Sequence, residues 1–530
     1  MLNTARSLRG MVTAPHHLAA QAGLDVLKDG GCAIEAAVTV AATLAVVYPH
    51  MTSVGGDSFW LICRPDGTVR SIDACGRAGS LATPDWYRSQ DMTTIPWRGG
   101  AAANTVAGTV SGWEKALSLR PESRTRLTRE RLLRDAIWYA DNGVAVTRSG
   151  AEIAVEKGEG LRAAPGYAAV FEPAGRPLQT GEILKNPALA GTFRRLASNG
   201  FRSFYDGAVA KDIAQDLAAA GSPVTEEDLA RQEAELREPL SVTVRDARLF
   251  NMGPPTQGIA SLLILALFDR LVVTSGESFA HIHGLVEATK KAFRYRDAHV
   301  GDPAWMTEDC QALLSSPEAL DAMARDIRPD RAAPWPHRSQ LGDTVWFGVT
   351  DAAGCSVSMI QSTYFEFGSG VVLPQTGIVW QNRGASFRIA ERGWNILSPG
   401  RKPFHTLNPA AALFSDGRRM VYGTMGGEGQ PQTQAALFTR YARFGMELQE
   451  AITAPRWLLG RTWGEETTTL KYEDRFDPAL ITALADAGHA VERVAPFTSL
   501  TGHAGALVRH PGGLIEGATD PRSDGGVAAW

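Results

Sequence analysis

The feature that most constrains the fold is an apolar stretch near the start of the chain. Residues Cys32–Val47 contain little that is polar apart from Glu35 and two threonines. The stretch is too short to cross a bilayer, which takes about 20 apolar residues, so it predicts a helix buried on every side. Such a helix needs layers of other elements around it, and a chain of 530 residues has the material to supply them.

Helices and strands follow one another in blocks. A helix over His17–Lys28 precedes the apolar helix, and the segment from Arg124 to Glu238 has mostly helical patterns. After an Arg- and Pro-rich, exposed connector at Arg328–Ser339, short β-branched runs bounded by Gly and Pro predict antiparallel strands. These runs are Thr344–Val349, Ser356–Ile360, Gly377–Gln381, Ala410–Phe414, Met420–Gly423 and Ala506–Arg509. The pattern predicts a layered α+β protein with helices outside and sheets inside.

Composition excludes several classes of function. The net charge is −4 with no polybasic run, so neither nucleic acid nor an anionic membrane is expected as a partner. The five cysteines are scattered without a CxxC pair, which argues against a disulfide framework and a zinc ribbon. The N-terminal segment lacks the apolar core of a signal peptide, so a cytoplasmic location is expected.

Motifs for metals and nucleotides are missing from the sequence. His281 and His283 lie two positions apart on a predicted helix, so they point away from each other and are poorly placed to chelate one ion. Neither HExxH nor GxxxxGK[ST] occurs. We therefore expect no metal and no other cofactor.

Thr344 stands where the connector meets a strand. A threonine hydroxyl is a weak nucleophile unless a base lies beside it. If the chain is cut before Thr344, the new α-amino group can be that base, because its ordinary pKa is about 7.7–8.0. The plainer interpretation of this segment alone is a β-branched residue that opens a strand.

A set of motifs along the chain decides between these interpretations. From Gly10 to the C-terminus the chain resembles the gamma-glutamyltranspeptidase family of N-terminal-nucleophile hydrolases, through motifs that are weak singly but occur in the family's order. They are Gly30–Ala37, Pro49–His50, Gly55–Phe59, Gly108–Trp113, Leu285–Ala288, Gly301–Pro303, Asp343–Thr344, Phe367–Gly370, Gly377–Ile378, Asn408–Pro409, Gly426–Gly427 and Ala518–Arg522.

The resemblance implies a fold and a maturation step. The fold is a four-layer αββα sandwich, and the precursor cleaves itself between Asp343 and Thr344. The products are a large chain, 1–343, and a small chain, 344–530, which together form one structural domain as a heterodimer.

The resemblance also implies catalytic roles. Thr344 is the nucleophile, Ser362 replaces a threonine that hydrogen-bonds it, and Gly426 and Gly427 present N–H groups to the oxyanion. The plainer interpretations are a solvent-facing strand serine at Ser362 and a tight turn at the glycine pair.

The substrate pocket departs from the family pattern. The family's carboxylate-binding arginine falls on Pro84, its paired serines on His405 and Thr406, and its amine-binding asparagine on Tyr364. Arg383 stands in the segment where the family has acidic residues, so a free ammonium would be repelled there.

These departures predict a pocket for a carboxylate without an amine. Arg383, His405, Thr406, Tyr364 and Arg77 are the expected substrate-binding residues, because arginine binds carboxylates bidentately. The alternative is that Arg383 and Arg77 form structural ion pairs.

The expected activity is hydrolysis of a small carboxylate-bearing amide, oxamate-like, through an acyl-enzyme, with acyl transfer as a side activity. Three alternatives remain: a γ-glutamyl hydrolase or transpeptidase acting on glutathione-like substrates, a glutaryl- or cephalosporin-type acylase, and an uncleaved binding or scaffold protein. A higher oligomer is also left open.

Overall fold

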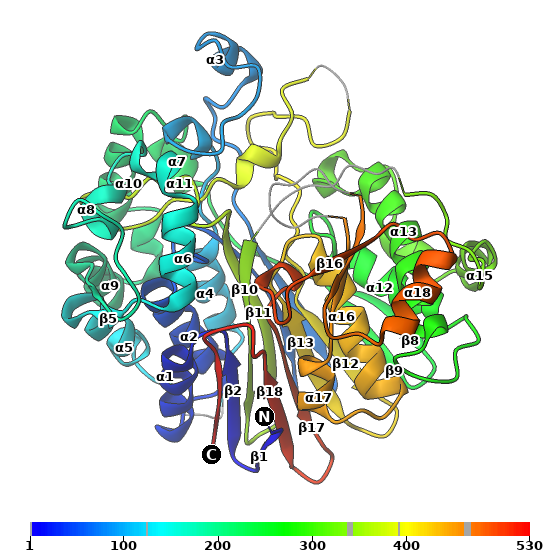
Figure 1. The fold of residues 1–530 in the computed structure, drawn as a ribbon. Helices are drawn as coiled ribbons and strands as arrows, with labels where there is room; N and C mark the ends of the chain where they lie inside the picture. The colour runs from blue at the N-terminus through cyan, green and yellow to red at the C-terminus, as the bar shows by residue number, and fades with distance from the viewer. Residues whose placement is uncertain (1–2, 123–125, 336–342, 391–392, 461–467) are drawn as a thin grey trace.

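The computed structural model describes residues 3–122, 126–335, 343–390, 393–460 and 468–530. Two seven-stranded antiparallel sheets lie face to face, and helices cover the outer face of each (Figure 1). The first sheet has the order β1 (Ala5–Ser7), β18 (Ile515–Thr519), β17 (Ala504–Arg509), β13 (Arg419–Thr424), β12 (Ala410–Phe414), β9 (Ala247–Asn251) and β8 (Leu240–Val244). The second has the order β19 (Gly526–Ala529), β2 (Gly10–Ala14), β10 (Asp343–Asp351), β11 (Ser356–Tyr364), β3 (Asp57–Cys63), β4 (Val69–Ala74) and β7 (Glu235–Arg237).

The helices form the two outer layers. On the side of the second sheet, drawn blue to cyan-green in Figure 1, are α1 (His17–Lys28), α2 (Ala33–Val47), α4 (Thr109–Ser118), α5 (Arg129–Asn142), α6 (Arg148–Glu156), α7 (Gly158–Arg162), α8 (Tyr167–Phe171), α9 (Pro187–Asn199), α10 (Ala208–Ala219) and α11 (Glu226–Ala230). On the side of the first sheet are α12 (Gly258–Phe268), α13 (Phe279–His299), α14 (Cys310–Leu314), α15 (Pro317–Arg325), α16 (Gly429–Phe438), α17 (Leu448–Thr453) and α18 (Pro478–Asp486). The short helix α3 (Pro84–Arg88) projects at the top of the view. The αββα sandwich predicted from the sequence is confirmed.

The apolar helix is the centre of one outer layer. Every residue of α2 is buried, and the Glu35 carboxylate accepts the Cys32 N–H at 3.0 Å at the start of the helix. Burial on all sides is what a helix without a polar face requires.

The space between the two sheets has its own apolar core. Trp346 of β10 points into it, whereas Val345 and Phe347 on either side pack into the core under α2. Gly423 and Gly505 of the facing sheet make room for the indole, since an added Cβ would lie 2.2 Å and 2.5 Å from Trp346 ring atoms. Part of the chain's glycine content is explained by this close approach.

One local expectation needs correction. Gly377–Gln381 is not a strand: Val379 and Trp380 form only isolated bridges, to Val372 and Gly55, and Gly377 has a φ of 68°. Helix α16 begins at Gly429, and Pro431 is tolerated in its first turn because no backbone donor is needed there. Residues 336–339 of the Arg328–Ser339 connector lie outside the described residues.

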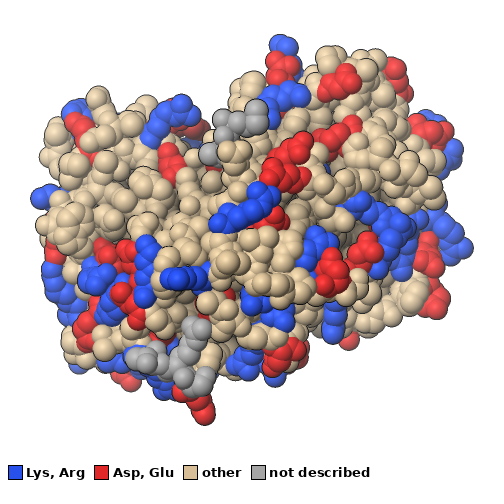
Figure 2. Space-filling view, turned by 90° about the horizontal axis from the view of Figure 1, so that it is seen from below, with Lys and Arg blue, Asp and Glu red and all other residues tan. Residues whose placement is uncertain are grey.

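Charges of both signs are interspersed on the face shown in Figure 2, without a continuous basic field. Among the described residues, no helix combines the length and apolarity that crossing a membrane demands.

Candidate active site

Thr344 lies near the start of β10, in the middle of the second sheet. The pairing of β10 with β11 shifts between Asp343 and Val345, so Thr344 occupies an irregular position in the ladder. Its side chain is fully buried, and Oγ1 accepts a hydrogen bond from Gln430 Nε2 at 3.4 Å. Gln430 lies in the first turn of α16, so the chain brings a helix start to the predicted nucleophile.

Ser362 lies on the neighbouring strand β11, opposite Asp57 of β3. Its hydroxyl accepts the N–H of Tyr364 at 2.7 Å. Tyr364 has a φ of 83°, which is uncommon for a residue with a side chain. The serine therefore supports a turned backbone that aims Tyr364 toward Arg383.

The glycine pair joins β13 to α16. Gly426 has a φ of 112° and Gly427 a φ of 50°, conformations that favour glycine over any residue with a Cβ. The Gly427 carbonyl accepts a hydrogen bond from Gln257 Nε2 at 2.8 Å. The pair therefore has a fixed backbone conformation. It precedes the N-terminal end of α16, where Gln430 contacts Thr344.

Arg383 is a buried cation that interacts electrostatically with Asp57 but forms no direct ion pair within the described residues. Its guanidinium lies 3.8 Å over the Tyr364 ring and donates long hydrogen bonds to Phe404 O (3.4 Å) and Thr406 Oγ1 (3.5 Å). It is 1% exposed, and it has no ion pair with any described carboxylate. Burial lowers its pKa to about 10, so it stays charged at neutral pH. A buried charge without a counter-ion is costly, and an anionic ligand would relieve that cost.

Asp57 and His405 face each other beside this guanidinium. Asp57 Oδ1 accepts hydrogen bonds from Gly76 N and Gly108 N, both at 2.9 Å, whereas Oδ2 lies 3.4 Å from His405 Nε2. Burial raises the pKa of Asp57 to about 7. Burial, then Arg383 and Lys402, lower the pKa of His405 well below its ordinary value, so the imidazole is neutral. Sequence reasoning missed Asp57 as a site residue, although a lone acid in an otherwise apolar strand was a usable signal.

Arg77 forms a structural ion pair, which is the alternative to substrate binding that the sequence left open. Its side chain is 45% exposed, forms an ion pair with Glu235 at 3.1 Å and donates to Gly400 O at 3.2 Å. Substrate binding by Arg77 stays a prediction.

The histidines of α13 have separate partners. His281 Nε2 lies 2.9 Å from Thr439 Oγ1, and His283 Nδ1 lies 2.9 Å from His489 Nε2. His283, His489 and Glu287 come close enough to hold a metal. The two imidazoles already bond each other, however, and Lys290 already neutralises Glu287 at 2.6 Å. The cluster is therefore better described as a buried hydrogen bond beside an ion pair than as a cation site.

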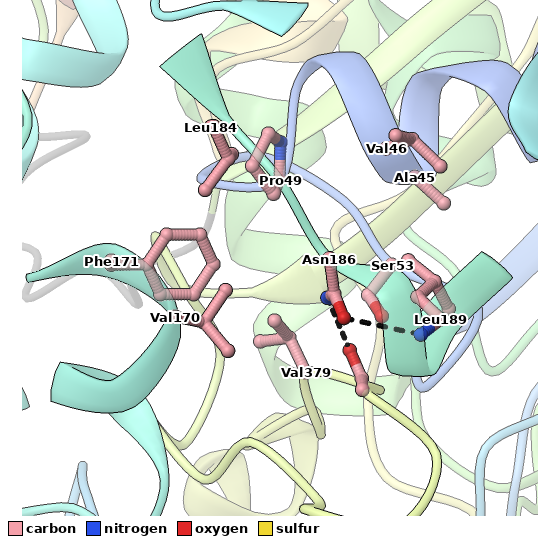
Figure 3. A pocket seen from close by; sticks show the side chains of 11 residues that line it. Ala45, Val46, Pro49, Ser53, Val170, Phe171, Leu184, Asn186, Leu189 and Val379 are labelled. Carbon is pink, nitrogen blue, oxygen red and sulfur yellow. Dashed lines mark hydrogen bonds between the residues drawn. The ribbon is translucent and has the colours of Figure 1, made fainter. Parts of the chain in front are cut away.

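A cavity between α2, α8 and α9 is separate from these groups (Figure 3). It has a volume of about 10 Å³, and its walls are mostly apolar side chains such as Val46, Phe171 and Val379. Asn186, one of the two polar side chains that line it with Ser53, is already bonded to Gly377 O and Leu189 N. A volume of this size holds about one water molecule.

Comparisons with known proteins agree with the fold and the motifs. Residues 19–530 match the family model for gamma-glutamyltranspeptidase. The chain is 54% identical to the oxamate amidohydrolase proenzyme of Klebsiella pneumoniae, over 99% of both chains. It is 40% identical to the glutathione hydrolase-like YwrD proenzyme of Bacillus subtilis, over 97% of both. Cephalosporin acylase from Bacillus halodurans superposes with a TM-score of 0.91 at 31% identity, over 100% of this chain and 97% of the acylase. The chain therefore belongs to the gamma-glutamyltranspeptidase family.

Proposed function

We propose that this protein is a self-processing amidohydrolase that cleaves the amide of a small carboxylate, with oxamate as the best candidate substrate. The observation that carries the proposal is the buried Arg383 guanidinium, which has no carboxylate partner among the described residues. The 54% identity to an oxamate amidohydrolase proenzyme supports the same substrate class.

Maturation would use the same hydroxyl as catalysis. Thr344 Oγ attacks the carbonyl carbon of Asp343, and the peptide nitrogen leaves as the α-amine of Thr344. Water then hydrolyses the resulting ester, which leaves chains 1–343 and 344–530. Because each sheet contains strands from both chains, the products would stay together as an interleaved heterodimer.

Turnover would follow in two steps. The α-amine of Thr344 takes the hydroxyl proton while Oγ attacks the substrate amide, and the backbone N–H groups of Gly426 and Gly427 stabilise the oxyanion. The amine returns the proton to the leaving ammonia, and water deacylates the ester. In the contact between Gln430 and Thr344 the amide donates, so that bond does not use the hydroxyl proton.

The γ-glutamyl alternative needs an acceptor for the α-ammonium of the substrate. Asp57 is the acidic group beside His405, but its Oδ2 is directed at the imidazole and its pKa is raised to about 7 by burial. Arg383 also opposes a second cation in the pocket. These charges favour an acyl group that carries a carboxylate alone.

We infer a cytoplasmic location, since all five cysteines are free and buried.

Ammonia or amine release from oxamate, glutaramate and a γ-glutamyl anilide tests the substrate class. We expect oxamate to have the highest kcat/KM and Arg383→Ala to lower it at least 100-fold. Asp416→Asn, a surface change, is the control. Faster turnover of the γ-glutamyl compound than of oxamate would contradict the proposal.

A further inference from the structure

Gln257 connects the two halves of the proposed site. Its side-chain nitrogen donates to Thr406 O at 2.6 Å and to Gly427 O at 2.8 Å. Its backbone N–H donates to His405 O at 2.9 Å, and its neighbour Thr256 forms a bridge with His405. Gln257 is fully buried at the start of α12, so water does not compete for these bonds.

Arg296 of α13 fixes the orientation of this amide. Its Nη1 donates to Gln257 Oε1 at 2.8 Å, and its Nη2 donates to Glu428 Oε1 at 2.9 Å. Arg296 and Glu428 are each about 1% exposed. Because Oε1 is the acceptor from Arg296, the NH₂ group of Gln257 must face the two carbonyls.

These bonds limit the distance between two functional segments. A single nitrogen binds both carbonyls, so Thr406 O and Gly427 O cannot lie further apart than its two hydrogen bonds allow. Thr406 also contacts Arg383, the proposed carboxylate anchor, and Gly427 is one of the proposed oxyanion donors. This short separation favours a substrate with few atoms between its carboxylate and its reacting carbonyl.

We propose that Gln257, held by Arg296, is a positioning residue that sets the length of the acyl pocket and selects two-carbon monoamides over longer homologues. The proposal rests on the proposed function, because it takes Arg383 and Gly427 as the groups that hold the substrate ends.

The test is the ratio of kcat/KM for oxamate to kcat/KM for succinamate, its homologue with two more carbons. A ratio does not depend on the fraction of enzyme that has matured. We expect a ratio of at least 100 in the wild type. Gln257→Glu keeps the length and the Arg296 contact but loses the N–H donors, and we expect it to lower the ratio at least 10-fold. Arg296→Lys should lower it in the same direction, by less.

Gln449→Glu is the matched control. Gln449 is also buried and also donates to a backbone carbonyl, that of Thr519, but it joins α17 to β18 away from the site. It should change stability without changing the ratio. A Gln257→Glu enzyme that loses both activities equally would overturn the proposal, since a merely structural role predicts that result. If Gln257→Glu is inactive, an Arg296→Lys enzyme with an unchanged oxamate-to-succinamate ratio would overturn the proposal. A wild type that cleaves neither amide would instead refute the proposed function.

Discussion

His405 Nε2 lies 3.4 Å from Asp57 Oδ2, and neither atom has a hydrogen-bond partner within the described part of the chain. Both groups are buried beside Arg383, whose charge opposes the effect of burial on the pKa of Asp57 and adds to the effect of burial on the pKa of His405. A carboxyl whose pKa lies near 7 can change its charge under assay conditions. The pocket therefore has a charge that depends on pH, with Asp57 as the group that titrates.

This titration predicts the direction of the pH dependence of substrate binding. Below about pH 7 the Asp57 carboxyl is protonated, and Arg383 is left without an opposing charge. Above that pH the new negative charge weakens the attraction for an anionic substrate. We expect the KM for oxamate to rise at least threefold between pH 6 and pH 8.5, and Asp57→Asn to flatten the rise. Steady-state kinetics separate this effect on KM from effects on kcat, which also depends on the protonation of the Thr344 α-amine. An equally steep rise in Asp57→Asn would remove Asp57 from this role.

We expect the Arg383 side chain to lower the stability of the fold and to be necessary for activity. Replacing it with Met removes a buried cation that has no ion-pair partner in the described part of the chain, so we expect a Tm at least as high as that of the wild type. The same change should lower kcat/KM for oxamate at least 100-fold. Thermal unfolding and ammonia release measure the two effects. A Tm lowered by several degrees would indicate a structural role instead.

Gly426 should be needed for its backbone conformation. Its φ of 112° strains any residue with a Cβ, so Gly426→Ala would turn the adjacent N–H groups away from the oxyanion. Loss of one such donor costs about 2.7–4 kcal/mol, or roughly 100- to 1,000-fold in kcat. Gly512→Ala is the control, since space is open around that loop glycine. Full activity of Gly426→Ala would contradict the assignment.

Asp520 is expected to matter for stability. It lies in a fully buried network in which it pairs with Arg522 at 3.0 Å and also with Arg456. Asp520→Asn leaves two buried cations short of a counter-charge, which typically costs about 3–5 kcal/mol. Thermal unfolding should show a large drop in Tm, whereas an exposed change such as Asp416→Asn should have little effect. A small change in Tm would mean that Glu473, which also pairs with Arg522, balances the network alone.

The parts of the fold that follow from local pattern were predictable. The apolar composition of α2 required burial on every side, and the alternation around Trp346 matched a strand between two cores. The segment Gly377–Gln381 misled because β-branched residues also suit single bridges between loops.

The site was only partly predictable, for a physical reason. Arg383 stood out because it placed a charge where the family has the opposite charge. Three other residues could not be recognised in this way, because their roles come from contacts between segments far apart in the chain. They are Asp57, Gln257 and Gln430. Residue spacing describes one helix or strand at a time and carries no information on such contacts. Arg77 shows the converse, since its charge is engaged by Glu235 near the surface.

Intact-mass analysis of freshly purified protein during incubation tests the central claim most directly, that Thr344 is the nucleophile. We expect wild-type protein to convert into two chains whose masses place the cut between Asp343 and Thr344. Thr344→Ser, which keeps a hydroxyl, should convert more slowly, and Thr344→Ala should remain one chain. Wild-type protein that stays whole, or Thr344→Ala that is cut at the same bond, would contradict the account.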